Sequence, residues 1–446
     1  MQRLIVLGLL YGGVQLVHPL GAGLHGSDAL LTFGFLILAA YTSGELAESA
    51  RLPRIVGYLL AGVLFGPSVL GTVSVEATAQ LAPVGSLAIA LIAFLAGAEL
   101  RWGEVRERGR AITRILTAEL GLTFVALASL LVLMREYVPF LAGEPLPTVL
   151  GFGILFAAIA VVHSPAVTMA LLTETRARGP VARTTLGVVL VSDVVVIVMF
   201  SGALALARTL VPPTGEDVVA VSMAGVAWEL GGALLVGAVL GGAVALYLRV
   251  VRLHLVLFVV LVAFFGAEVA RLAHVETLLT LLMAGFVTEN VSRPADGVAL
   301  RHAVERSGAP VFVVFFALAG AAMRLEDVLR VWPLVIPLVL VRAGGIWAGV
   351  RVGARWARLA PETGRHIWMG LISQAGVAIG LATVITEVYP VRGALLRTLF
   401  LATLAVNQTV GPILFRLALG RSGEIDATGD AERAPVDATS AVAAAH

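Results

Sequence analysis

Residues 184–204 read TTLGVVLVSDVVVIVMFSGAL, an apolar run with one charged residue, Asp193, near its centre. About 20 apolar residues are enough for a helix to cross the roughly 30 Å hydrocarbon core of a bilayer. Similar runs recur along the chain, whose mean hydropathy is +0.96 and whose charged residues make up only 13%. Soluble domains carry about 25% charged residues. The sequence therefore predicts a single all-α membrane domain.

Apolar runs bounded by Pro, Gly or charged residues predict the individual transmembrane helices. The predicted spans are residues 4–20, 28–48, 53–70, 81–100, 112–134, 147–173, 183–210, 221–248, 253–270, 275–290, 307–323, 330–350, 366–388 and 395–416. Residues 1–27 form either an extra N-terminal helix or a signal-like segment, so we expect 13–14 transmembrane helices. Residues 418–446, rich in Ala, Asp and Thr, are expected to be a disordered cytoplasmic tail.

The arginines indicate the orientation of these spans. All 31 basic residues are Arg, and most fall on alternate loops that lie on one side of the membrane when the N-terminus is inside. Positive charge concentrates on the cytoplasmic side, so this distribution predicts a multi-pass membrane protein with a cytoplasmic C-terminus. The chain has no cysteine, which excludes disulfides and thiolate chemistry.

Two charged residues lie deep within predicted spans. Arg342 sits near the middle of PLVIPLVLVRAGGIWAGV (residues 333–350), where an Arg costs at least about 3 kcal/mol and needs an acidic partner, carbonyl groups or a water-filled cavity. Asp193 lies ten residues into its span, about 15 Å from its start. It is the matching acid, either as a structural partner of Arg342 or as a carboxylate that binds a cation or a proton. A third acid, Glu119, is expected to be interfacial and paired with Arg114 or Arg110.

Two other spans contain motifs that disrupt a helix. In residues 153–174, GILFAAIAVVHSPAVTMALLTE, Pro165 follows His163 and Ser164, and a proline removes a backbone donor. In residues 366–387, HIWMGLISQAGVAIGLATVITE, Ser373 and Gln374 interrupt the apolar run. Each motif alone fits an ordinary kink or an interhelical hydrogen bond. Paired breaks in two halves of a membrane protein indicate a transport site.

The order of these features predicts two inverted repeats of six helices each, residues 28–210 and 253–417, joined by a linker helix in residues 211–252. The fifth helix of each half carries a break. The sixth carries a polar centre, Asp193 in one half and Asn407 in the other. A pseudo-two-fold axis in the membrane plane would cross the broken helices at the midplane, as in secondary transporters.

The segment RLPRIVGYLLAGVLFGPSVLG, residues 51–71, closely resembles the monovalent cation/proton antiporters, in the prokaryotic branch that includes Kef-type proteins. Weaker matches in the same order are FLAGAEL at residues 94–100, FFALAG at 315–320 and GVAIGLA at 376–382. The resemblance covers roughly residues 28–417. It implies a homodimer with an elevator-like motion, Asp193 as the ion-binding carboxylate and Arg342 as the basic residue facing it.

Two departures from the family pattern bear on the site. The family usually has Asn, Asp or Gln before the key Asp, where this chain has Ser192, and His163 stands where Thr or Ser is common. We expect Ser192 and Ser164 to complete an oxygen shell for the cation. His163 is either a group that titrates near neutral pH or a neutral hydrogen-bonding group.

The predicted function is exchange of Na⁺ or K⁺ for H⁺ by alternating access. Exchange should be one for one and electroneutral, because Ser192 is not a second acid. A sodium-coupled symporter of a small organic anion and a Kef-type potassium efflux channel are the alternatives. No cofactor and no nucleic-acid partner are expected. The sequence has no His-Glu-x-x-His motif, and an enzyme is disfavoured.

Overall fold

The structure is a computed structural model that describes residues 27–50, 52–98, 100, 102–212, 223–251, 255–293, 312–323, 325–374 and 377–425, with a few of the first twelve. Every regular element in those ranges is helical, which confirms the all-α class. Most of the predicted span 4–20 and most of the tail 418–446 lie outside the described residues.

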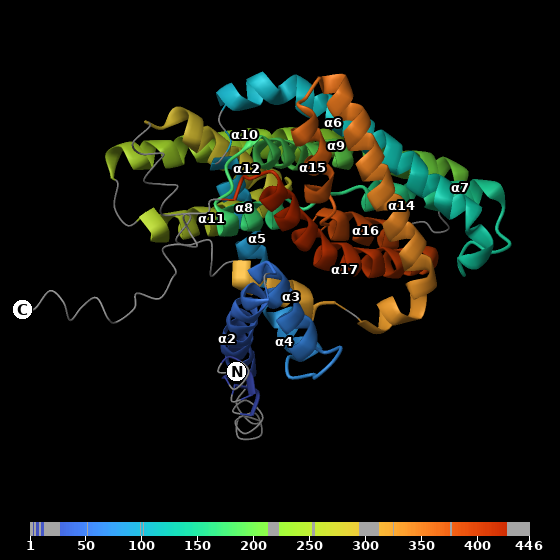
Figure 1. Ribbon diagram of the computed structural model, residues 1–446, viewed down its shortest axis with the longest axis horizontal. Helices are drawn as coiled ribbons and strands as arrows, with labels where there is room; N and C mark the ends of the chain where they lie inside the picture. The colour runs from blue at the N-terminus through green and yellow to red at the C-terminus, as the bar shows by residue number, and fades with distance from the viewer. Residues whose placement is uncertain are drawn as a thin grey trace, which may run out of the picture.

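The helices follow the order of the predicted spans (Figure 1). The first half contains α2 (Ser27–Ser49), α3 (Arg54–Phe65), α4 (Val75–Gln80), α5 (Ala82–Ala98), α6 (Trp102–Leu133), the 3-10 helix η1 (Arg135–Tyr137), α7 (Leu146–Ala160), α8 (Pro165–Thr175) and α9 (Pro180–Leu210). α10 (Met223–Val250) lies in the predicted linker. The second half contains α11 (Leu255–Leu272), α12 (Thr277–Val291), the helix Phe312–Ala321, α14 (Leu325–Ala357), α15 (Pro361–Gly370), α16 (Val377–Val388) and α17 (Pro390–Arg421). Six stretches among the described residues are long and apolar enough to cross a membrane, and shorter apolar helices accompany them.

Several helices differ in length from their predicted spans. α6 begins at Trp102 rather than residue 112, and α14 runs from Leu325 to Ala357 rather than over 330–350. Hydropathy detects only the part of a helix in hydrocarbon, whereas Arg and Glu are good helix formers that continue it beyond. α3 is shorter than predicted and ends at Phe65, because Pro67 follows and cannot continue a helix.

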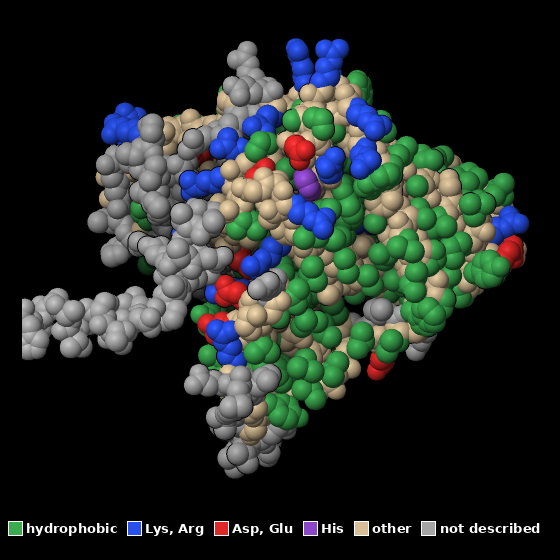
Figure 2. Space-filling model, viewed as in Figure 1, with side chains coloured by type: hydrophobic (Ala, Val, Ile, Leu, Met, Phe, Trp, Pro, Cys, Tyr) green, Lys and Arg blue, Asp and Glu red, His purple; other side chains and the backbone are tan. Residues whose placement is uncertain are grey.

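The buried side chains form two large hydrophobic clusters. α6, α7, α9 and α14–α17 build the first, which we call the crossing bundle because it contains the residues between α7 and α8 and those between α15 and α16. α2, α3, α5, α8, α11 and α12 contribute most of the second. In Figure 1, α2 and α3 project together below the main group of helices. Figure 2 shows apolar side chains spread over the face formed by α7, α14 and α17, while most of the basic side chains in view lie above this face and to its left. That distribution fits a lipid-facing belt bordered by charged side chains.

Three glycines of α14 set the contact between α6 and α14 at the centre of the crossing bundle. A methyl group added at Gly345, Gly349 or Gly353 would collide with the backbone of α6, at Glu119 in the case of Gly349. Small residues spaced four apart let membrane helices approach backbone to backbone. The contact places Glu119 of α6 level with Gly349, two turns along α14 from Arg342.

Candidate functional site

The first break separates α7 from α8 at residues 161–164, where the sequence predicts it. α7 ends at Ala160, and Pro165 is the first residue of α8. The Ser164 hydroxyl oxygen accepts a hydrogen bond from the backbone N–H of Val167 at 3.2 Å, so it caps the new helix. Ser164, predicted as a cation ligand, is therefore engaged in the local fold of the break.

The second break separates α15 from α16. α15 ends at Gly370, residues 371–374 are not helical, and α16 begins at Val377. Ser373 is buried, and its hydroxyl has no hydrogen-bond partner among the described residues. The two half-helices α7 and α15 both end near the same point of the crossing bundle, as the contacts of Arg342 show.

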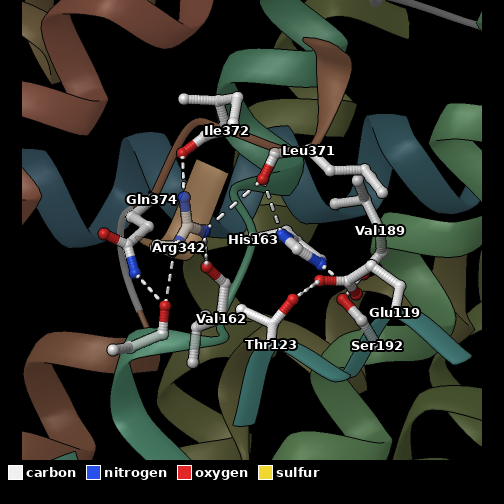
Figure 3. Close-up of polar contacts among 11 residues, drawn as sticks. Glu119, Thr123, Val162, His163, Val189, Ser192, Arg342, Leu371, Ile372 and Gln374 are labelled. Carbon is white, nitrogen blue, oxygen red and sulfur yellow. Dashed lines mark hydrogen bonds and ion pairs between the residues drawn. The ribbon is translucent and has the colours of Figure 1, made fainter. Parts of the chain in front are cut away.

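Arg342 joins the two breaks through backbone carbonyls (Figure 3). Its Nε donates to the carbonyl of Ala160 at 2.6 Å and Nη1 donates to Ile372 at 2.7 Å. Nη2 donates to Val162 at 2.9 Å and more weakly to Leu371 at 3.4 Å. The side chain is 2% exposed. The prediction that Arg342 is the charge partner of Asp193 is wrong, because the guanidinium is held by carbonyl oxygens of both breaks.

Helix electrostatics explains why Arg342 needs no acid at its side. The C-terminal end of a helix carries about half a negative elementary charge, concentrated on its unpaired carbonyls. α7 and α15 both direct such ends at Arg342, so together they supply about the one unit of charge that the guanidinium requires. Pairing the charged side chains of a sequence considers only their formal charges and leaves out the partial charges at helix ends.

Gln374 and Asn407 extend the same polar junction. Gln374 Nε2 donates to the carbonyl of Ala160 at 2.6 Å, and Asn407 Nδ2 donates to Gln374 Oε1 at 2.8 Å. Both side chains are buried. α17 is thereby connected through Asn407 and Gln374 to the end of α7. These two residues, predicted to line the broken helices, connect the end of α7, the second break and α17 at this junction.

Asp193 stands apart from this junction. It lies on α9, is 5% exposed, and neither carboxylate oxygen has a hydrogen-bond partner among the described residues. A buried carboxylate with no partner is costly, since burial removes its hydration. Ser192 is also buried, and its hydroxyl donates to the carbonyl of Val189 at 2.6 Å. The oxygens of Asp193 are therefore available to a cation or a proton.

Asp193 lies where the crossing bundle meets α10 and α12. Its neighbour Val194 packs against a small cluster that contains Ala233 of α10, together with Val275 and Leu279. Glu276, which accepts from the backbone N–H of Leu279 at the start of α12, is close enough to Asp193 for the two charges to interact. Asp193 thus lies near a boundary between two groups of helices, the position that an alternating-access site requires.

Glu119 and His163 form a second buried ionisable pair, which the sequence did not predict. Glu119 and His163 are both fully buried, and His163 Nε2 lies 3.0 Å from Glu119 Oε2. Glu119 is not interfacial, and its bond to His163 replaces the predicted pairing with Arg114 or Arg110; Arg114 donates to the carbonyl of Trp356. His163, predicted at the ion site, instead has both ring nitrogens bound within the protein.

Comparison with known proteins identifies the family. Residues 34–418 match the family described as "Sodium/hydrogen exchanger, transmembrane". The chain belongs to the sodium/hydrogen exchanger family. The antiporter family predicted from the sequence is thereby confirmed.

Solved structures of a sodium proton antiporter share the fold of this exchanger. One structure of MjNhaP1 from Methanocaldococcus jannaschii, at pH 8, superposes with a TM-score of 0.65 at 18% identity, over 88% of this chain and 96% of that one. An electron-microscopy structure of the same antiporter gives 0.69 at 16% identity, over 90% and 98%. At these identities the likeness establishes the fold.

A curated relative is similar over a shorter region. "Iron transporter MagA" from Paramagnetospirillum magneticum is 34% identical over 174 residues, 38% of this chain. The match spans 36% of that relative's length. Its name therefore describes that protein and does not assign a substrate to this exchanger.

Proposed function

We propose that this exchanger moves Na⁺ or K⁺ against H⁺, with Asp193 as the group that binds either ion. The observation that supports this most strongly is a buried carboxylate whose two oxygens have no hydrogen-bond partner among the described residues. Carboxylate oxygen is a hard ligand that suits a small monovalent cation. A proton neutralises the same group equally well, so cation and proton compete for it.

Because the cation and the proton compete for one carboxylate, their movements across the membrane are coupled. An ionised Asp193 without a counter-ion would carry its charge through the membrane field, at about 2.3 kcal/mol per 100 mV, in addition to the cost of desolvation. Binding of either ion removes that charge. The carrier therefore crosses loaded in both directions, and the net result is exchange.

The polar junction formed by Arg342, Gln374 and Asn407 would move as one rigid unit in this cycle. Arg342 and Gln374 tie the end of α7 to the second break, and Asn407 adds α17. The boundary beside Asp193 is formed with α10 and α12. An elevator-like displacement of the crossing bundle along that boundary would expose Asp193 to each side in turn while the polar junction stays intact.

The proposed architecture comprises two inverted repeats, residues 28–210 and 253–417, in a homodimer of a bacterial inner membrane with a cytoplasmic C-terminus. Matching features support the repeats. The fifth helix of each half is broken, and the fourth helices, α6 and α14, pack closely on one another through the glycines of α14. The mass of the protein in detergent and the accessibility of a C-terminal tag in oriented vesicles test the last two points.

Cation-driven proton movement tests the function directly. Proteoliposomes that hold a pH-sensitive dye and a K⁺ load should acidify inside when K⁺ leaves in exchange for H⁺, and parallel loads of Na⁺ and Li⁺ establish the preference. Choline-loaded vesicles are the control. Proton movement that requires an added organic anion would favour the symporter, and no cation-dependent proton movement would contradict the proposal.

Exchange should be electroneutral, because one carboxylate carries either one cation or one proton. We expect the steady-state cation gradient to follow the pH gradient alone and to stay unchanged when K⁺ and valinomycin set the membrane potential in Na⁺-loaded vesicles. A shift of the gradient with potential would show that a second proton travels with each cycle.

A further inference from the structure

An ion pair joins α8 and α17 at the end of the helices where α3 begins. Glu174 lies on the last turn of α8, and Arg416 lies near the end of α17. Arg416 Nη1 lies 3.6 Å from Glu174 Oε1, and both side chains are partly exposed. On α3, Arg54 Nε donates to Glu48 Oε2 of α2 at 2.9 Å, so α2 and α3 are tied to one another. The exchange cycle proposed for Asp193 uses none of these four side chains.

Each member of the ion pair also bonds the backbone at the start of α3. Glu174 Oε1 accepts from the backbone N–H of Arg54 at 3.0 Å. Arg416 Nη1 donates to the carbonyl of Leu52 at 2.8 Å. Pro53, the residue before α3, has no side chain that could cap the helix, so Glu174 supplies the acceptor and the negative charge that a helix start favours. Two side chains of opposite charge thus hold the beginning of α3.

Hydrophobic packing seals the boundary on the same side of Asp193. Leu186 and Leu190, in the two turns of α9 before Asp193, share a hydrophobic cluster with side chains of α2, α3 and α5. Beyond Asp193, Val196 packs within the crossing bundle, and Val194 borders a much smaller cluster of α10, α11 and α12. Among the described residues, the boundary is therefore packed most extensively between Asp193 and the ion pair.

The ion pair can release α3 without leaving a charge unpaired. α8 and α17 contact one another directly, so Glu174 and Arg416 stay together if both helices move away from α3. Leu52 and Arg54 are partly exposed, and water can replace the two lost hydrogen bonds of their backbone. Exchanging such a bond for one to water changes an equilibrium only several-fold. The contact is therefore suited to opening and closing repeatedly.

We propose that Glu174 and Arg416 form a latch that closes the exchanger on the side of α3 and opens once in every cycle. The proposal rests on the exchange cycle proposed for Asp193. A displacement of the crossing bundle that exposes Asp193 to the latch side carries α8 and α17 away from α3 and breaks both backbone bonds. Glu174 and Arg416 are positioning residues. The structure is accordingly the state closed on the latch side, which is outward-facing if the C-terminus is cytoplasmic.

The accessibility of a single introduced cysteine tests the latch, because the chain contains no cysteine of its own. Leu190→Cys places a thiol in the sealed packing one turn before Asp193. We expect Glu174→Ala to raise the rate at which a membrane-impermeant reagent labels this thiol from the latch side at least about fivefold, since a bond that favours the closed state is lost. An unchanged labelling rate would overturn the proposal.

Glu144→Ala is the matched control for the labelling experiment. It removes another carboxylate that pairs with an arginine of α17, Arg392 near the first turn, and that ion pair does not involve α3. The labelling rate of Leu190→Cys should remain at the wild-type value in Glu144→Ala. An equal rise in both variants would show general loosening of the helices and would count against a latch.

The KM for the cation on each side separates a shift between states from damage to the fold. We expect Glu174→Ala to lower the KM for Na⁺ or K⁺ presented on the latch side and to raise it on the opposite side, because more carriers then face the latch side. Arg416→Met, which keeps the bond from Arg54 to Glu174, is the second variant should Glu174→Ala not fold. It should shift both KM values in the same directions. A fall in maximal rate with both KM values unchanged would contradict the latch, while cation-driven proton movement in the wild type would still support the exchange function.

Discussion

Asp193→Asn should abolish coupled exchange while leaving the protein folded. Asparagine has nearly the shape of aspartate but neither binds a proton in this pH range nor neutralises a cation. We expect cation-driven proton movement in proteoliposomes to fall to the level of protein-free vesicles. The exchange rate should fall at least about 100-fold, which corresponds to about 2.7 kcal/mol, because both ions depend on this one charge.

Stability should move in the opposite direction. The Asp193 oxygens have no hydrogen-bond partner among the described residues, and a buried charge without a partner destabilises the fold. An amide is less costly to bury, so the thermal unfolding midpoint of Asp193→Asn should equal or exceed that of wild type in detergent at neutral pH. A purely structural aspartate would give the reverse, a lower midpoint.

Ser201→Ala provides the matched control for this variant. Ser201 is buried on α9, two turns beyond Asp193, and its hydroxyl donates to the carbonyl of Ile197 in its own helix. Removing it changes the polarity of the same helix without touching the carboxylate. Exchange should be retained in Ser201→Ala. Robust proton-coupled flux in Asp193→Asn would rule out Asp193 as the shared site.

Most of the fold could be predicted from hydropathy. About half of the site could be predicted from the polar residues that interrupt apolar runs. The apolar runs predicted the helices because a membrane-spanning segment must satisfy its own backbone. The breaks beside Pro165 and at Ser373 were also predictable, because the two motifs occupy corresponding helices of the two halves. Asp193 was found by the same reasoning, as a charge in the centre of a span.

The partners of the buried charges could not be predicted, because they depend on backbone groups and on helix contacts. Arg342 was assigned to Asp193 by matching formal charges, but the helix ends at Ala160 and Leu371 supply its counter-charge. Glu119 was placed at the interface because arginines lie one to two turns before it. Its true environment follows from the glycine contact of α14, notably Gly349, which holds α6 close to the crossing.

Arg342→Met should loosen the contact between the two breaks that Arg342 joins. Methionine has a similar length but no donor, so the carbonyls of Val162, Ile372 and Leu371 would lose the guanidinium, while Ala160 keeps its bond from Gln374. Removing one partner from a buried charged network costs about 3–5 kcal/mol. We expect a marked drop in the thermal unfolding midpoint and loss of exchange together, in contrast to Asp193→Asn, where the two separate.

Arg342→Lys distinguishes the role of the hydrogen bonds from that of the charge. An ammonium keeps the positive charge opposite the two helix ends but is a compact donor that cannot reach carbonyls on both sides with a planar fork. If the charge alone matters, Lys restores both stability and exchange; if the fork holds the breaks in register, stability recovers in part and exchange remains low. We expect the second outcome, because Nε and both terminal nitrogens bond different carbonyls.

Arg351→Gln on the same helix, where the arginine stacks over Trp347, should behave as wild type. A fully stable and active Arg342→Met would refute the assignment of Arg342 as the joint between the two broken helices.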